Sequence, residues 1–303
     1  MPPRQLDQLG FYIDPLDPLL GQRLRWLRAQ GVNYVGFDGM GHREPPELVQ
    51  MRRCVEDADL DLVVIHGEPG MVAANGDDAA LRQAHLGVLQ RAEALGARVV
   101  VLHFRILHGS LPGGYRDENE FVDALGLAEY DRRMTDLLRF LAAEADARGL
   151  QLALENLPLQ WQYARRITDL VAYLETLALP NVRMCLDSGH AHLSGEVIAD
   201  AIRTGREWLL TTHLHDNFGV CGPDSKVLDT DRHLVPGFGT INWPEAIRAL
   251  REIEFAEPIM FEGVRTIPHG TRPDFEPAAE LTLANWEVFE RLADQLDLPP
   301  AHR

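Results

Sequence analysis

The chain has 303 residues, of which 46% are hydrophobic and 25% are charged, so it is long enough to bury one large core. Its formal net charge of -17 disfavours a nucleic-acid partner, because contacts between basic residues and phosphates supply most of the affinity for DNA and RNA. The sequence contains no run of about 18 apolar residues, and its N-terminus lacks the basic start and apolar stretch of a signal peptide. These features predict a cytoplasmic protein without a membrane segment.

Cysteine and lysine usage argues against a scaffold held by disulfides or zinc and against Schiff-base catalysis. The three cysteines, Cys54, Cys185 and Cys221, have no CxxC spacing, which argues against a disulfide scaffold or a zinc ribbon. Cys185 lies within an apolar run and is interpreted as a small core residue. Lys226 is the single lysine, so nearly every route to Schiff-base catalysis is closed.

Apolar runs of about five residues alternate with segments of helical spacing along the chain. The runs are typical of buried parallel strands and cover Leu9 to Ile13, Tyr34 to Phe37, Leu60 to Ile65, Ala97 to Leu102, Gln151 to Leu154, Val182 to Leu186, Trp208 to Leu214 and Ile259 to Phe261. The predicted helices cover Pro18 to Gln30, Pro45 to Ala58, Asp78 to Leu95, Leu127 to Arg148, Ile167 to Leu177, Val197 to Arg203, Trp243 to Ile253 and Ala278 to Gln295. Glycines follow three of these helices, at Gly31, Gly96 and Gly149, where a left-handed cap favours them. The alternation predicts a single (β/α)8 barrel spanning residues 1–303.

Three connections are too long to be simple turns: 103–126, 156–166 and 215–242. Each follows the C-terminal end of a predicted strand, which is the face of a (β/α)8 barrel that carries chemistry. We therefore expect lids or substrate walls there, with a surface insertion without a role as the alternative.

Four apolar runs end in a residue that can bind a metal: Glu155, Asp187, His213 and Glu262. The C-terminal ends of the strands meet at one mouth of a barrel, so these side chains are expected to converge on one divalent ion. Mainly hard oxygen donors favour Mn, Mg or Co over a structural Zn. The alternative is that each residue only ends a strand and caps the next helix, as Asp187 could.

A second set of candidate ligands lies on the same rim: His66, His103, His190, Asp231 and His233. Each histidine taken alone is compatible with an ordinary half-buried, hydrogen-bonded side chain. Together they are expected to bind substrate or additional metal, since paired ions need bridging carboxylates flanked by histidines.

Five segments resemble the xylose-isomerase-like TIM barrel superfamily, and they contain these residues: ENLP, LDSGHAH, THLHDN, DRHLVPGFGTINW and PIMFEG. That superfamily includes sugar phosphate isomerases and epimerases, ketose 3-epimerases, inosose-handling enzymes and the endonuclease IV type of apurinic-site nuclease. The resemblance spans roughly His66 to Glu262.

The resemblance to ketose epimerases implies that Glu155, Asp187, His213 and Glu262 hold one divalent ion, usually Mn or Co. It also implies that Glu155 and Glu262 are the catalytic acid and base. Such a metal polarises a carbonyl and its neighbouring hydroxyl, so that a glutamate can remove the carbon-bound proton. The expected activity is therefore that of a carbohydrate isomerase or epimerase with a small-molecule sugar substrate. In that scheme His190 and His233 bind sugar oxygens.

The resemblance to the nuclease branch implies a different centre, in which nine ligands hold three zinc ions. This chain retains all nine: His66, His103, Glu155, Asp187, His190, His213, Asp231, His233 and Glu262. The residues that follow Glu155 and His103 depart from the nuclease pattern, and the net charge of -17 argues against a DNA groove. A metal-dependent hydrolase or phosphodiesterase with a multinuclear zinc site is the alternative function, together with a related sugar dehydratase.

Two further expectations concern the substrate walls and assembly. Trp161 and Arg165 follow Glu155 in a long connection and can stack on a sugar face and bind an anion, although packing beneath the loop explains Trp161 equally well. Homo-oligomers are common in this superfamily, and a homo-oligomer is compatible with the sequence.

Overall fold

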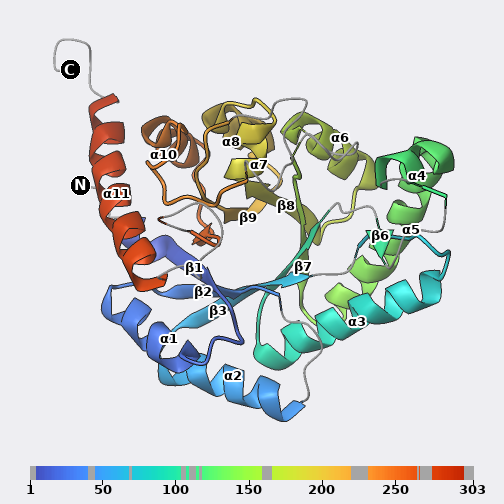
Figure 1. The fold of residues 1–303 in the computed structure, drawn as a ribbon, viewed down its shortest axis with the longest axis horizontal. Coiled ribbons are helices and arrows are strands. Elements are labelled where there is room, and N and C mark those ends of the chain that lie inside the picture. The colour runs from blue at the N-terminus through green and yellow to red at the C-terminus, as the bar shows by residue number, and fades with distance from the viewer. Residues whose placement is uncertain are drawn as a thin grey trace.

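The fold is a (β/α)8 barrel with helices around a nearly closed ring of parallel strands (Figure 1). The computed structural model describes residues 5–39, 45–67, 70–103, 107–108, 114–115, 118–158, 166–219, 231–264, 266 and 275–296. The order of its eight-stranded sheet is β10-β1-β2-β3-β5-β7-β8-β9. A parallel bridge between Leu214 and Phe261 joins the two ends of that order, which brings β9 beside β10 and closes the ring.

Each strand of the barrel coincides closely with one predicted apolar run. The strands are β1 (Leu9–Ile13), β2 (Tyr34–Phe37), β3 (Asp61–Gly67), β5 (Val99–His103), β7 (Gln151–Glu155), β8 (Val182–Asp187), β9 (Leu209–His213) and β10 (Ile259–Phe261). All the neighbouring pairs within the sheet are parallel. The predicted fold class is therefore confirmed.

The predicted helices also form, and they cover the outside of the barrel (Figure 1). They are α1 (Leu20–Ala29), α2 (Pro45–Asp57), α3 (Asp78–Leu95), α5 (Leu127–Asp146), α6 (Ile167–Leu177), α8 (Ile198–Gly205), α10 (Trp243–Glu252) and α11 (Phe275–Leu296). The glycine after α3, Gly96, has a φ of +81°, and Gly31 and Gly149 also have positive φ values of +87° and +68°. These conformations confirm the glycine caps that the sequence predicts.

Several short elements are additions to the predicted pattern. They are the 3-10 turn η1 (Gln5–Gln8), the helices α4 (Glu118–Leu125) and α7 (Ser188–Leu193), and the paired strands β4 (Val72–Ala73) and β6 (Leu107–His108). Both β6 and α4 lie inside the connection 103–126, so part of that connection has regular structure. Among the described residues, no helix combines the length and apolar composition that a bilayer-spanning helix requires.

Apolar side chains form a large cluster that joins the strands to the surrounding helices and a smaller one contributed by the strands alone. The smaller cluster consists of Tyr12, Val63, Val64, Val101, Ala153, Cys185, Leu210 and Met260. Successive side chains of a strand alternate between its two faces, so we place this cluster in the barrel interior. In five strands the residue two positions after a member of this cluster is a predicted site residue: His66, His103, Glu155, Asp187 and Glu262. Strand alternation thus aims these side chains into the mouth of the barrel.

Candidate metal centre

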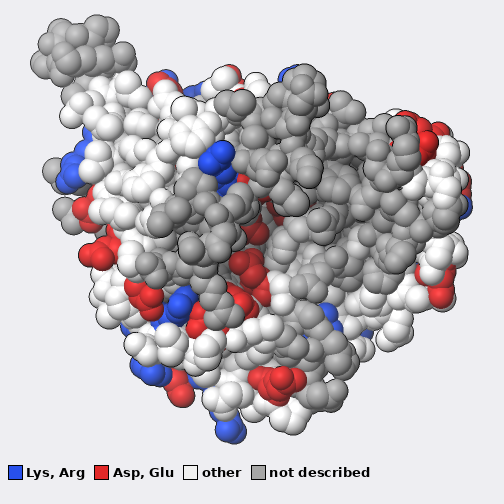
Figure 2. Space-filling model, in the orientation of Figure 1, with Lys and Arg blue, Asp and Glu red and all other residues white. Residues whose placement is uncertain are grey.

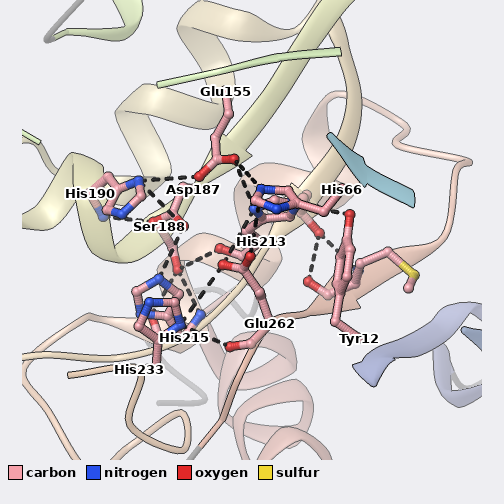
Figure 3. A network of polar contacts seen from close by, with 12 residues as sticks. Tyr12, His66, Glu155, Asp187, Ser188, His190, His213, His215, His233 and Glu262 are labelled. Atoms are coloured by element: carbon pink, nitrogen blue, oxygen red, sulfur yellow. Dashed lines mark hydrogen bonds and ion pairs between the residues drawn. The ribbon is translucent and has the colours of Figure 1, made fainter. Parts of the chain in front are cut away.

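The four predicted primary ligands converge at the mouth of the barrel (Figure 3). One potential ligand atom from each of Glu155, Asp187, His213 and Glu262 lies within 4.8 Å of those of the other three. Nδ1 of His213 lies 3.2 Å from Oε2 of Glu155 and 3.4 Å from Oε2 of Glu262. All four residues are buried, with Glu262 the most exposed at 8%. Three carboxylates and one imidazole are thereby gathered around one point.

This arrangement fits a divalent cation. Nε2 of His213 lies 2.8 Å from the hydroxyl of Tyr12, which fixes the orientation of the ring. Nδ1 of the same ring is buried and makes no hydrogen bond, although it faces the two glutamate oxygens. A nitrogen lone pair facing anionic oxygens is unfavourable unless a proton or a cation lies between them. Against the effect of burial, the two carboxylates accordingly help to raise the pKa of His213 well above its ordinary value. A metal bound by Nδ1 and the carboxylates would supply such a cation.

The geometry of Asp187 is compatible with both roles that the sequence leaves open, helix cap and metal ligand. Its Oδ1 accepts a hydrogen bond of 2.7 Å from the backbone N–H of His190, so Asp187 is the N-cap of α7. The side chain amide of Asn156 donates a 3.0 Å hydrogen bond to the Asp187 carbonyl oxygen. The other carboxylate oxygen of Asp187, Oδ2, lies 3.5 Å from Nδ1 of His190 within the site. Capping and ligation are therefore compatible in this residue.

Glu155 is surrounded by histidines. Its Oε2 lies 3.3 Å from Nε2 of His66 and 3.1 Å from Nε2 of His103. Its Oε1 lies 3.3 Å from Nδ1 of His190. With His213, four imidazoles meet this one carboxylate, which is 1% exposed. Glu155 is thus the central anion of the cluster.

Asp231 and His233 complete the rim beyond His190. Oδ2 of Asp231 lies 3.1 Å from Nε2 of His190 and 3.3 Å from Nε2 of His233. Nδ1 of His233 lies 3.8 Å from Oε2 of Glu262. His233 has a φ of +46°, a left-handed conformation that costs free energy for any residue other than glycine. The structure therefore brings all nine predicted donors into one continuous cluster.

The buried carboxylate of Asp216 accepts hydrogen bonds from the segment that follows His233 and holds it in place. Asp216 accepts hydrogen bonds from the backbone N–H of Gly237 at 2.8 Å and of Ile241 at 3.2 Å, and from Nε1 of Trp243 at 2.9 Å. Gly237 has a φ of +93°, a conformation that favours glycine. Residues 234–243 are thereby tied to the end of β9.

The charges of the cluster compensate one another. Burial would raise the pKa of Glu155, but His213 and His103 hold it well below its ordinary value. Burial would lower the pKa of His190, but Asp187 and Asp231 raise it well above its ordinary value. Asp231 likewise outweighs burial and raises the pKa of His233 to about 9, whereas burial lowers that of His103 to about 4. Without a metal, protons on His190 and His233 therefore balance ionised carboxylates.

Comparison with known proteins identifies the family. The model of the xylose isomerase-like TIM barrel family matches residues 24–285, which is most of the chain. The chain belongs to this family. Among curated proteins, D-psicose 3-epimerase of Agrobacterium fabrum is 25% identical over 218 residues, covering 71% of this chain and 68% of that protein. Protein y4fM of Sinorhizobium fredii is 28% identical over 172 residues, covering 56% of this chain and about half, 49%, of that protein.

Solved structures show the same barrel at low sequence identity. The 3-keto-D-glucoside 4-epimerase of E. coli has a TM-score of 0.73 and 16% identity, and the alignment covers 93% of this chain and 99% of that one. An L-ribulose 3-epimerase has a TM-score of 0.69 and 17% identity, and the alignment covers 97% of this chain and 99% of that one. These likenesses show that the barrel is shared along nearly the whole chain.

One residue of this xylose isomerase-like site was missed by the sequence interpretation. Nε2 of His215 lies 3.1 Å from Oδ2 of Asp187. Its ring stacks on that of His233, with centroids 3.8 Å apart and an interplanar angle of 10°. His215 follows His213 by two positions, and the period of a strand would have placed both on one face.

Asp38 is a second residue that was missed. It follows Gly36 by two positions, and a Cβ on Gly36 would meet Tyr12 and Val64, which belong to the interior cluster. A carboxylate oxygen of Asp38 lies within 4.8 Å of ligand atoms of His66 and Glu262. Burial, together with the negative charge of Glu262, raises the pKa of Asp38 to about 6. The alternation of side chains along β2 could have predicted this position, because it places Asp38 on the same face as Gly36.

The remaining expectations divide into two groups. Cys185 is buried in β8, as predicted for a core residue, and burial raises the pKa of its thiol to about 12. Trp161 and Arg165, the predicted substrate-wall residues, lie outside the described residues, as does Cys221.

Proposed function

We propose that the chain is a metal-dependent epimerase or isomerase acting on a small carbohydrate. The proposed ligands of its divalent ion, Mn, Co or Mg, are Glu155, Asp187, His213 and Glu262. One observation carries the proposal: the carboxylates of Glu155 and Glu262 approach the centre from opposite sides and both face Nδ1 of His213 (Figure 3). The names of the epimerases to which the chain is similar support the same class of substrate.

The two glutamates would move the proton. When bound, the ion would polarise the substrate carbonyl and its neighbouring hydroxyl, which makes the carbon-bound proton more acidic. One glutamate removes that proton, and the other returns a proton to the opposite face of the same carbon. Return of the proton to the opposite face inverts the configuration of that carbon, whereas delivery of the proton to the neighbouring carbon isomerises the sugar. His190 and His233, on the rim of the site, would hydrogen-bond sugar oxygens.

Proton exchange with solvent tests this assignment. The metal-loaded protein is incubated with D-psicose, D-tagatose or L-ribulose in D2O, and the loss of carbon-bound protons is followed by NMR. Glu155→Gln removes a proton acceptor with little change of shape, so exchange should fall by about 100- to 10,000-fold. Glu175→Gln, an exposed substitution on α6, serves as the control. Full exchange in Glu155→Gln would exclude Glu155 as a required group.

The additional donors favour a second candidate function, a metal-dependent phosphodiesterase with a multinuclear zinc site. Two further groups of potential ligands overlap the primary one, Asp187 with His190 and His215, and His215 with His233 and Glu262. Metal analysis of protein purified without added metal separates the candidates. One ion per chain supports the epimerase or isomerase, whereas three zinc ions with incision of an apurinic-site duplex would replace it.

A further inference from the structure

A cavity of about 320 Å³ lies beside the metal centre, at the ends of β1, β2 and β10. Its walls include Tyr12, Asp14, Asp38 and Gly263, with Arg23 of α1 and Phe275 of α11. None of the site residues predicted from the sequence is among its described lining residues. It is therefore a feature of the mouth that the proposed proton transfer leaves unused.

The cavity borders the metal centre on the side of Glu262, because three of its lining residues contact or adjoin the proposed ligands. The hydroxyl of Tyr12 lies 2.8 Å from Nε2 of His213, and Gly263 directly follows Glu262. Asp38 places a carboxylate oxygen within 4.8 Å of a ligand atom of Glu262. A substrate whose reacting carbon lies between Glu155 and Glu262 can therefore extend past Glu262 into the cavity.

The charged side chains in the described walls of this cavity are mostly acidic, and the other lining residues are mainly apolar. Asp14, Asp17 and Asp38 face a single described cation, Arg23. The guanidinium of Arg23 already faces carboxylates, with Nη1 3.1 Å from Oδ2 of Asp17 and Nε 3.7 Å from Oε1 of Glu276, and it lies 5.4 Å from the ring centroid of Phe275. On the face of the molecule that Figure 2 shows, acidic side chains also lie within the central hollow. At these described carboxylates a phosphate group would meet like charge, whereas a hydroxyl group would find acceptors.

Asp38 is the acceptor best placed for a substrate. The carboxylates of Asp14 and Asp17 each accept a 2.8 Å hydrogen bond from a nearby backbone N–H, in the turns at Leu16 and Leu19. The carboxylate of Asp38 accepts no hydrogen bond from any residue that the structure describes. Asp38 is also the one of these three that lies beside Glu262. With respect to the described residues, its oxygens can thus accept hydrogen bonds from hydroxyl groups of a substrate.

We propose that this cavity is the subsite for the hydroxyl-bearing tail of an unphosphorylated sugar, and that Asp38 determines specificity by accepting hydrogen bonds from that tail. The inference rests on the proposed function, because it assumes that the reacting carbon lies between Glu155 and Glu262. It adds the substrate class, which is a neutral sugar and not a sugar phosphate. Asp38 contributes by binding and not by moving the proton.

Binding measurements test the subsite separately from turnover. D-psicose, D-tagatose and L-ribulose are each compared with their terminal phosphate esters on the Mg-loaded protein, using ligand-observed NMR. At least one neutral sugar should bind about tenfold more tightly than its ester, because hydrogen bonds to a charged acceptor are strong and like charges repel. Asp38→Asn should weaken binding of the neutral sugar about tenfold, with metal content unchanged. The difference in affinity between the neutral sugar and its phosphate ester should therefore become smaller. Asp57→Asn, exposed at the end of α2, is the matched control.

The outcomes distinguish the subsite from the proposed reaction. Tighter binding of the phosphate esters to the unaltered protein would overturn the subsite and needs no variant. Unchanged affinities in Asp38→Asn, or no binding of any of the six ligands, would overturn it as well. An Asp38-dependent preference for a neutral sugar without proton exchange would support the subsite while refuting the proposed reaction. Proton exchange without any effect of Asp38 would leave the reaction standing and remove the subsite.

Discussion

At the scale of single residues, the site is organised by carboxylates that are oriented by imidazoles. Glu155 meets four histidines, and Asp187 is held by His215 at 3.1 Å as well as by the N–H of His190. Groups that contact a ligating carboxylate fix its direction and tune its affinity for a metal. His215 therefore belongs to the site although it is absent from the predicted ligand set.

His215→Ala is expected to weaken metal binding by about 10- to 100-fold while the barrel still folds, because Asp187 loses the partner that orients one of its oxygens. Titration with Mn followed by calorimetry measures the affinity, and circular dichroism checks the fold. His192→Ala is the control, since that ring contacts the hydroxyl of Thr240 at 2.8 Å and no carboxylate of the site. Equal affinities in the two variants would show that His215 does not orient Asp187.

At the scale of elements, the short helix α7 is fitted tightly against the segment that follows β9. A Cβ at Gly189 would collide with the ring of His215, so α7 can approach only with glycine at this position. The amide of Asn217 adds a 2.9 Å hydrogen bond to the carbonyl oxygen of Gly189. The close approach brings His190 and His215 to the same carboxylate, Asp187.

Gly189→Ala should destabilise the protein by about 1–3 kcal/mol, because the added methyl group forces α7 or His215 to move. Gly87→Ala in α3 offers a matched comparison, since its Cβ would meet only the flexible tip of Arg91 at 3.2 Å. That control should be neutral or stabilising by about 0.5–1 kcal/mol through helix propensity. Denaturant unfolding measures both. Similar stabilities for the two variants would show that the packing of α7 tolerates a side chain.

At the scale of the whole molecule, the proposed ligands connect four strands that follow one another around the barrel. Glu155, Asp187, His213 and Glu262 end or follow β7, β8, β9 and β10, and the bridge between Leu214 and Phe261 joins the last pair. A metal that binds only the folded arrangement is linked to the stability of the entire barrel.

Metal binding is therefore expected to raise the melting temperature by several degrees, since a ligand at 100 times its Kd adds about 2.7 kcal/mol. The imidazole nitrogen of His213 must lose its proton to bind a metal. The metal-induced rise in melting temperature should therefore become smaller as the pH falls and His213 is protonated. Thermal unfolding at several pH values, with and without Mn, Co, Mg or Zn, measures this. An unchanged melting temperature with all four metals would remove the metal centre from the proposal.

The barrel itself was predictable from the chain because its signals are local. Buried parallel strands read as short apolar runs, and glycine marks the helix ends at positions such as Gly96. The helix α7 escaped prediction because its sequence, SGHAHL, is too short and too polar to show a helical period. The helix α4 escaped because it lies within a connection rich in glycine and polar residues.

The sequence by itself determined the fold class and which donor types end the strands, because burial and strand period are properties of neighbouring residues. Only the tertiary structure decided which donors meet. The four histidines around Glu155 come from separate parts of the chain, and their distances depend on how the ring of strands closes. The same closure brings Asp38 beside Glu262 and leaves a cavity there, which no local pattern specifies.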